Sequence, residues 1–259
     1  MQDGNIRVYY MFSKSQISLL TSLQHKKFRR EHGLFLVEGY KSICEFIDSH
    51  YHIHTIYHTP DVAPKLLKLS QKINFQEISL AELQKISGLK NPADAIATVN
   101  IPQWPGLNDV NLKNKFSLVL DGVQDPGNMG TIIRTADWFG IANIICSEDS
   151  VDVYNPKVVQ ATMGSLARVN IIYTNLTDFI SQINLPVYGA LLNGENIYTN
   201  NFGLEGLIVM GNEGNGIRPG IQQLVTKAVT IPRIGNAESL NVAIATAIFC
   251  SEAVGKSYK

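Results

Sequence analysis

Short apolar strands alternate with helices over residues 116–255, and this alternation constrains the fold more than any other feature of the chain. Apolar runs predict strands at residues 116–120, 143–146, 169–173, 187–191 and 207–210. Helical periodicity predicts helices at residues 129–139, 156–162, 177–183 and 242–253. Such alternation indicates an α/β fold with a mostly parallel sheet and helices on both faces, whose ligands bind at the carboxyl ends of the strands.

Two runs near the C-terminus carry glycine and amide residues, at positions 207–216 and 231–241. Each is predicted as an apolar strand that ends in a turn, where small residues let the backbone approach a ligand. The first turn matches neither GxGxxG nor GxxxxGK[ST], which disfavours a pyrophosphate ligand. Two such turns in one domain predict a shared binding site.

A third polar segment begins with a Pro-Gly turn after the strand at 116–120 and continues into a helix that starts near Asn128. At 100 degrees per residue, the apolar residues of this helix share one side and leave Arg134 off it. Arg134 can therefore point at a ligand. The alternative is that Asn128 only caps the helix and Arg134 only pairs with Asp137.

Other polar residues near these turns also allow two interpretations. Glu213 either pairs with the nearby Arg218 or orients Asn128 or Arg134. Ser239 and Asn241 precede a helix that is apolar almost all round, which predicts burial against the sheet or a second subunit. They either cap this helix or serve the site, and both roles can coexist.

Composition divides the chain into four predicted parts. Residues 1–12 form an N-terminal extension, residues 13–100 a first domain, residues 101–115 a linker and residues 116–259 a second domain. The linker contains two prolines, one glycine and three asparagines, which suit neither a helix nor a central strand.

The formal net charge of zero gives no bulk attraction for nucleic acid. A local basic run nevertheless lies in the first domain, and it either contacts a polyanion or is a solvated helix end. Three widely spaced cysteines indicate reduced thiols, and the alternating His50, His52 and His54 have no cysteine or carboxylate cluster beside them, so no metal is expected. Neither a membrane span nor a secretory signal is evident, which predicts a cytoplasmic protein.

The motifs resemble a known family. Asp125-Pro-Gly-Asn128 with Arg134, then Gly211-Asn-Glu-Gly-Asn-Gly216, then Ile231-Pro-Arg and Glu238-Ser-Leu-Asn-Val242, resemble motifs one, two and three of the SpoU or TrmH type of SPOUT RNA ribose methyltransferases. The resemblance covers about residues 116–255. The first domain is more loosely similar to the small α/β RNA-binding domain, resembling a ribosomal-protein fold, that often precedes the catalytic domain.

This resemblance implies transfer of a methyl group from S-adenosylmethionine to a ribose 2′-hydroxyl of RNA, with S-adenosylhomocysteine as product. Ribosomal RNA is favoured over transfer RNA. It also implies a homodimer through the catalytic domain and a C-terminal trefoil knot, which no periodicity can predict because threaded chains are nearly absent among folds.

The resemblance also assigns residues to roles. The implied catalytic residues are Asn128, Arg134, Glu213, Ser239 and Asn241. The implied cofactor-binding residues are Met163, Gly164, Met210, Gly211, Asn212, Gly216, Ile231, Pro232, Ser239 and Leu240. The predicted RNA-binding residues are Lys26, Lys27, Arg29, Arg30 and Lys41.

Two rival functions differ in class. A non-catalytic RNA-binding module of the same fold would be expected to have lost Asn128, Arg134 or Asn241, and all three are present. A doubly wound enzyme that uses a nucleotide on a substrate other than RNA would bind nicotinamide or adenine nucleotides instead of S-adenosylhomocysteine.

Overall fold

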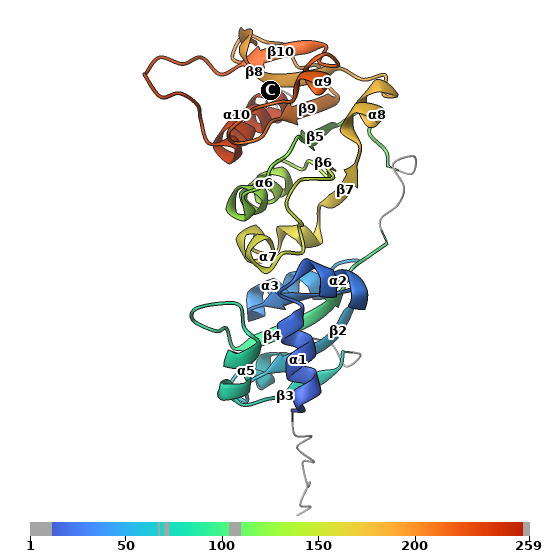
Figure 1. Cartoon of the computed structure of the whole chain (residues 1–259), viewed down its shortest axis with the longest axis vertical. Coiled ribbons are helices and arrows are strands. Elements are labelled where there is room, and N and C mark those ends of the chain that lie inside the picture. Colours follow the sequence, from blue (N-terminus) through green and yellow to red (C-terminus); the bar gives the residue numbers. More distant parts are fainter. Residues whose placement is uncertain (1–11, 67, 70–72, 104–109, 256–259) are drawn as a thin grey trace, which may run out of the picture. The chain divides into compact units, whose positions relative to one another are not determined.

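The computed structural model describes residues 12–66, 68–69, 73–103 and 110–255. Contacts divide the chain into two compact units, Met1–Pro102 and Gln103–Lys259, here called the first and second unit (Figure 1). The division falls inside the predicted linker, of which residues 104–109 lie outside the described residues. The predicted N-terminal extension lies outside them too, except for Phe12, which is buried and packs its ring 5.5 Å from that of Tyr57.

The first unit is a four-stranded mixed sheet with helices around it. The sheet has the order β1-β4-β2-β3, in which only β2 and β3 are parallel. Its strands are β1 (Leu34–Glu38), β2 (Ile53–His58), β3 (Phe75–Glu77) and β4 (Ala95–Asn100). Its helices are α1 (Lys14–Ser22), α2 (Lys26–His32), α3 (Tyr40–Ile47), α4 (Ala63–Leu66) and α5 (Leu80–Ile86).

The second unit is built on a six-stranded parallel sheet of order β10-β8-β9-β5-β6-β7. The strands are β5 (Phe116–Leu120), β6 (Asn143–Ser147), β7 (Asn170–Thr174), β8 (Val187–Asn196), β9 (Gly206–Met210) and β10 (Lys227–Thr230). The helices are α6 (Pro126–Trp138), α7 (Pro156–Thr162), α8 (Leu176–Ser181), α9 (Pro219–Gln222) and α10 (Val242–Gly255), with a short 3-10 turn η2 (Ser165–Ala167). The predicted α/β fold with a parallel sheet is thus confirmed.

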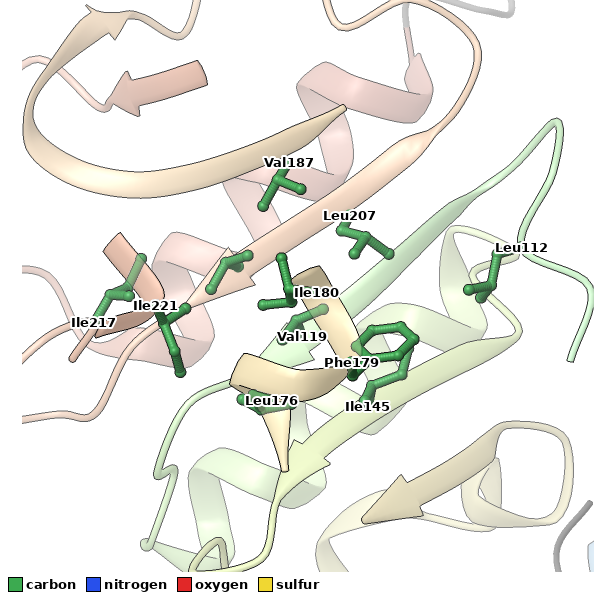
Figure 2. Packing of buried hydrophobic residues seen from close by; sticks show 11 residues of the cluster. Leu112, Val119, Ile145, Leu176, Phe179, Ile180, Val187, Leu207, Ile217 and Ile221 are labelled. Atoms are coloured by element: carbon green, nitrogen blue, oxygen red, sulfur yellow. The ribbon is translucent and has the colours of Figure 1, made fainter. Parts of the chain in front are cut away.

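Helices cover both faces of this sheet. Figure 1 shows α6, α7 and α10 on one side and α8 on the other. On the α8 side, Phe179 and Ile180 pack onto Val119, Ile145 and the neighbouring strands (Figure 2). Strands that are buried on both faces read as unbroken apolar runs, which is why the sequence predicts β5 and β9 so well.

Most predicted elements of the second unit match the structure, and two were missed. The predicted strand at 116–120 and the predicted helix at 156–162 have the bounds of β5 and α7. The run at 231–241 was wrongly predicted to begin as a strand: the strand before it is β10, whose residues Lys-Ala-Val-Thr carry too little apolar character to stand out. The four-residue helix α9 was not predicted because it makes barely one turn, which is too short for a helical pattern to repeat.

Membrane spans, metal sites and disulfides were not expected from the sequence. Within the described ranges, no helix is long and apolar enough to cross a membrane. No group of three or more histidine, cysteine, aspartate or glutamate side chains in that part of the chain is arranged to hold a metal ion. All three cysteines are free thiols, and burial raises the pKa of Cys250 to about 12.

Candidate active site

Three loops meet at the carboxyl edge of the second unit's sheet. Residues 121–125 follow β5, residues 211–218 follow β9, and residues 231–241 follow β10. All six strands are parallel, so their carboxyl ends lie on one edge, and β5 and β9 are direct neighbours. The predicted position of the site at this edge, where α/β sheets bind their ligands, is therefore the position at which the three loops converge.

A chain of side-chain hydrogen bonds joins the three loops. Asn128 Nδ2 donates to Glu213 Oε1 over 3.1 Å. Asn241 Nδ2 donates to Asn128 Oδ1 over 2.8 Å. A carboxylate can only accept, so Glu213 fixes the amide of Asn128 with its nitrogen toward the carboxylate and its oxygen toward Asn241. Of the two interpretations of Glu213, the pair with Arg218 is wrong, because Arg218 binds Asp121, and the contact of Glu213 with Asn128 is the one that the structure contains.

Glu213 is surrounded by further donors. Its carboxylate accepts from the backbone amides of Gln124 and Asp125 over 3.4 and 3.2 Å, and from Asn212 Nδ2 over 3.3 Å. Partial burial raises the pKa of Glu213, but the hydrogen bonds from Asn128 and the backbone outweigh it and bring the pKa below its ordinary 4.5. Glu213 is therefore ionised at neutral pH, and its carboxylate only accepts hydrogen bonds.

Of the two asparagines, Asn241 caps a helix with its side chain and Asn128 does not. Asn241 Oδ1 accepts from the amides of Ala243 and Ile244, so this residue caps α10 while it also bonds to Asn128. The cap of α6 is Asp125, which accepts from the amide of Asn128 over 2.8 Å. The alternative that Asn128 is only an N-cap is therefore wrong, because its side chain is engaged with Glu213 and Asn241.

Arg134 lies on the exposed face of α6. Asp137, the alternative partner considered for Arg134, instead pairs with Arg168, with 2.8 Å between Arg168 Nη2 and Asp137 Oδ2. The alternative that Arg134 serves only in a pair with Asp137 is thus wrong. Among the described residues no hydrogen bond or ion pair engages the guanidinium of Arg134, which leaves it available to an anionic ligand.

The loop at 231–241 offers unpaired backbone groups. Pro232, Ser239 and Leu240 are exposed, and Ile231 is half-buried. Within residues 232–240 the structure contains no backbone–backbone hydrogen bond, and Arg233 donates to the carbonyl of Ala237. Free amides and carbonyls at the carboxyl edge of a sheet suit a ligand that is bound through the backbone. The residues present therefore fit the cofactor that the sequence implies.

The loop at 211–217 is closed tightly on itself. Asn212 and Gly216 exchange two backbone hydrogen bonds of 3.0 Å, and Gly216 has a φ of 68°. A Cβ on Gly211 would lie 2.1 Å from the carbonyl carbon of Gly216, so only glycine fits. Asn212 Nδ2 also donates to the carbonyl of Gly122, which joins this loop to the one after β5.

Three predicted cofactor residues, Met210, Met163 and Gly164, take no part in the side-chain hydrogen bonds that join the three loops. Met210 is buried within β9, and its carbonyl accepts from the amide of Asp121. Met163 and Gly164 follow α7, and no hydrogen bond among the described residues joins them to the three loops. Arg168, a few residues on, binds Asp137 near the C-terminal end of α6, away from Asn128 at its start.

The predicted RNA-binding residues of the first unit differ in exposure. Lys26, Lys27, Arg30 and Lys41 are exposed. Arg29 is only 2% exposed, and its guanidinium donates to the carbonyls of Leu23 and Gln24 over 2.9 Å. The prediction for Arg29 is therefore wrong, because its side chain holds the end of α1 against α2 instead of facing solvent.

Sequence reasoning missed Asp121 as a member of the site. Its side chain is fully buried directly after β5 and binds Arg218. The available signal was a charged residue that directly follows a mostly apolar strand. Buried carboxylates are rarely left without a partner, so this position marks a structural contact.

Comparison with known proteins gives consistent matches for both units. Residues 115–251 match the SpoU rRNA Methylase family, and residues 14–97 match the MRM3-like substrate binding domain. The 23S rRNA (guanosine(2553)-2′-O)-methyltransferase of Bacillus subtilis is 28% identical over 243 residues, which cover 87% of this chain and 90% of that protein. The 23S rRNA (guanosine-2′-O-)-methyltransferase of Blochmanniella floridana is 34% identical over 196 residues, which cover 70% and 76%.

Solved structures resemble the chain over nearly its whole length. A protein of the TrmH family from Porphyromonas gingivalis superimposes with a TM-score of 0.85 at 38% identity, covering 95% of this chain and 99% of that one. An AdoMet-bound rRNA methyltransferase from Sinorhizobium meliloti superimposes with a TM-score of 0.84 at 29% identity, covering 93% and 95%.

Proposed function

The chain belongs to the SpoU rRNA methylase family, and we propose that it transfers the methyl group of S-adenosylmethionine to a ribose 2′-hydroxyl of ribosomal RNA. The observation that carries this proposal is the hydrogen-bonded chain from Glu213 through Asn128 to Asn241, with the exposed Arg134 on the same helix as Asn128. These four residues come from all three motifs, and two relatives of this chain are named as 23S rRNA 2′-O-methyltransferases.

The cofactor site is proposed at the loops after β9 and β10. Backbone groups of residues 232–240 and the glycine turn at Gly211 and Gly216 would hold S-adenosylmethionine, with Ile231, Pro232, Ser239 and Leu240 around it. The bound cofactor supplies an already activated methyl group on a sulfonium. The protein is left with two tasks, which are to place the ribose hydroxyl in line with that methyl group and to help its proton leave.

Arg134 is proposed to hold the phosphate next to the reacting ribose and to stabilise the developing alkoxide. A guanidinium has a pKa above about 12 and is a poor base at neutral pH. A neighbouring phosphate favours its charged form further. Arg134 therefore acts through charge and its planar donor fork, while the Asn128–Glu213 pair orients the residues around the reacting atoms.

The first unit is proposed to bind the RNA substrate through Lys26, Lys27, Arg30 and Lys41. Its match to a substrate binding domain supports this role. The target is proposed to be a nucleotide in a loop or single strand, because an enzyme can only reach a 2′-hydroxyl that is exposed. Action on ribosomal RNA also agrees with the predicted cytoplasmic location.

The second unit is proposed to form a homodimer. Trp138 on α6, Ile244 on α10 and Met163 after α7 are 84%, 53% and 57% exposed, and these helices share one side of the sheet (Figure 1). Large apolar side chains that stay exposed on the helices of one side of the sheet are typical of an interaction surface. In analytical ultracentrifugation, the double variant Trp138→Glu/Ile244→Glu is expected to sediment as a monomer. The control Leu204→Glu, which changes an exposed leucine outside these helices, is expected to stay dimeric. A monomeric wild type would contradict the proposal.

The experiment that tests the proposed function is a map of ribose methylation in 23S rRNA from cells with and without this protein. We expect one methylated ribose to be lost when the protein is absent and regained when it is returned. Unchanged ribosomal RNA together with a lost methylation in transfer RNA would overturn the substrate. Calorimetry that shows binding of nicotinamide nucleotides and none of S-adenosylhomocysteine would favour the rival enzyme class.

A further inference from the structure

Arg218 joins the carboxyl ends of three neighbouring strands beneath the candidate site. It follows the glycine loop after β9, and its guanidinium Nε donates to Asp121 Oδ1 at the end of β5 over 2.5 Å. Its backbone amide donates to the other carboxylate oxygen of Asp121 over 2.7 Å. The same guanidinium reaches Asp149, just beyond the end of β6, over 3.5 Å. Strands β9, β5 and β6 are adjacent in the sheet.

The Asp121–Arg218 contact is the stronger part of this tie. The side chain of Asp121 is completely buried, while those of Arg218 and Asp149 are about half exposed. A buried carboxylate needs a charged or hydrogen-bonding partner, and Arg218 supplies both, through its amide and its planar fork. The Asp149 contact lies at the solvent-exposed rim, where charge pairs contribute little.

The contact between Arg218 and Asp121 holds one end of the loop that carries Glu213. At one end of the loop, Asn212 is bonded to the carbonyl of Gly122, and at the other end Arg218 is bonded to Asp121. Residues 121 and 122 are adjacent, so both ends of the glycine loop are hydrogen-bonded to the same short segment directly after β5. Glu213 projects between these anchors toward Gln124, Asp125 and Asn128.

We propose that Arg218 is a positioning residue for methyl transfer, which holds the glycine loop against the end of β5 and thereby fixes Glu213 and the amide of Asn128. The guanidinium of Arg218 is engaged by the carboxylates of Asp121 and Asp149, so the proposal gives it no contact with the reacting atoms. The inference rests on the proposed function for its catalytic consequence, but the loop contacts can be tested without any substrate.

The first test measures hydrogen exchange of backbone amides in full-length Arg218→Lys. Lysine keeps the charge but cannot form the planar two-donor contact with Asp121. The amides of Gln124 and Asp125, which donate to Glu213, are expected to exchange about tenfold faster, because local opening of the loop exposes them. Exchange in the first unit is expected to stay unchanged, which separates a local effect from global destabilisation. Unchanged exchange at Gln124 and Asp125 would overturn the inference.

The matched control is Arg168→Lys. Arg168 is also a half-exposed arginine paired with an aspartate, but its partner Asp137 lies near the far end of α6. This variant is expected to leave both turnover and the exchange of Gln124 and Asp125 as in the wild type. Faster exchange at these two amides in Arg168→Lys would overturn the specific role of Arg218.

The second test is a double-mutant cycle on turnover. Arg218→Lys alone is expected to lower kcat about 10- to 100-fold, because small misplacements of orienting groups have effects of this order. In a Glu213→Gln background, the same change is expected to lower kcat by less than about twofold, since the group it positions is already impaired. An undiminished effect in that background would mean that Arg218 does not act through Glu213. No methyl transfer by the wild type would instead contradict the proposed function, and the exchange measurement would still decide the inference.

Discussion

Single residues decide the chemistry, and the clearest case is Arg134 on the exposed face of α6, whose guanidinium has no hydrogen-bond or ion-pair partner among the residues that the structure describes. We predict that Arg134→Ala lowers turnover on the order of 100- to 1000-fold, as loss of one electrostatic donor typically does. Binding of S-adenosylhomocysteine, measured by calorimetry, should change little, because Arg134 is proposed to contact RNA. Arg134→Lys should recover little activity, since a point charge does not reproduce the planar fork.

The control for Arg134 is Arg168→Ala, which removes a neighbouring arginine that is already paired with Asp137. It should retain nearly full turnover. Equal losses of cofactor binding and turnover in Arg134→Ala would contradict the role given to Arg134.

A second prediction concerns the charge of Glu213. Asn128→Asp replaces the donor to Glu213 with a like charge, and the lost hydrogen bond costs about 0.5–1.5 kcal/mol of stability. The pKa of Glu213 is depressed in the folded wild type, so its stabilising effect is present above pH 4.5 and is lost as the pH falls through the folded value. The difference in melting temperature between variant and wild type should therefore be larger at pH 7.5 than at pH 4.

The matching control is Asn201→Asp, an exposed asparagine whose side-chain oxygen accepts from the amide of Gly203 and can still do so as a carboxylate. It should melt like the wild type at both pH values. A pH-independent difference for Asn128→Asp would show that Glu213 is not the neighbouring charge that matters.

At the residue level, the sequence identified the polar residues of the site, but it did not show which residues they are hydrogen-bonded to. Asn128, Glu213 and Asn241 were identified, and the structure joins them. The burial of Arg29 could not be foreseen, because its partners are backbone carbonyls that carry no side-chain signal. The partner of Arg218 could not be foreseen for a different reason, since Asp121 lies 97 residues away in the chain.

Elements are positioned by close packing, and α6 and α7 are one pair of helices in close contact. A Cβ on Gly130 would lie 2.4 Å from the Cβ of Ala161 and 3.1 Å from the carbonyl oxygen of Val158. We predict that Gly130→Ala lowers the free energy of unfolding by about 1–3 kcal/mol through overpacking, measured by urea denaturation. Because α6 carries Asn128 and Arg134, turnover should fall as well.

The second change Ala161→Gly should recover part of this loss by removing the atom that clashes. Gly220→Ala is the matched control, because a Cβ there meets nothing within 4 Å. A stable Gly130→Ala variant would mean that α6 and α7 are not held as closely as the structure places them.

At the element level, the parallel sheet was predictable because its strands are buried on both faces. The strands β5 and β9 read as mostly apolar runs, whereas β10 at the edge of the sheet does not. The first unit was less predictable, since its sheet is mixed and its strands pair in an order that local patterns do not contain.

The whole molecule combines two compact units that are proposed to divide the work, with RNA bound by the first and the methyl donor by the second. We predict that RNA affinity falls with salt with a logarithmic slope near 0.7 per phosphate contacted on a single strand. Lys26→Glu/Lys27→Glu should reduce this slope by about 1.4 and leave the affinity for S-adenosylhomocysteine unchanged.

Lys65→Glu/Lys68→Glu makes the same charge change on exposed residues of the first unit outside the predicted basic run. It should leave the salt slope nearly as in the wild type. A salt-independent RNA affinity of the wild type would contradict the proposed role of the first unit. The C-terminal trefoil knot stays a prediction at this scale, because it depends on family likeness and not on any local pattern.

The central claim is that the three loops and Arg134 together methylate a ribose oxygen. The most direct measurement incubates the purified protein with S-adenosylmethionine labelled in its methyl group and with ribosomal RNA from cells that lack the protein. The RNA is then digested to nucleosides for mass spectrometry. We predict label in a single 2′-O-methyl nucleoside with the wild type and almost none with Arg134→Ala. Label on a base, or no label from a protein that binds S-adenosylhomocysteine, would contradict the claim.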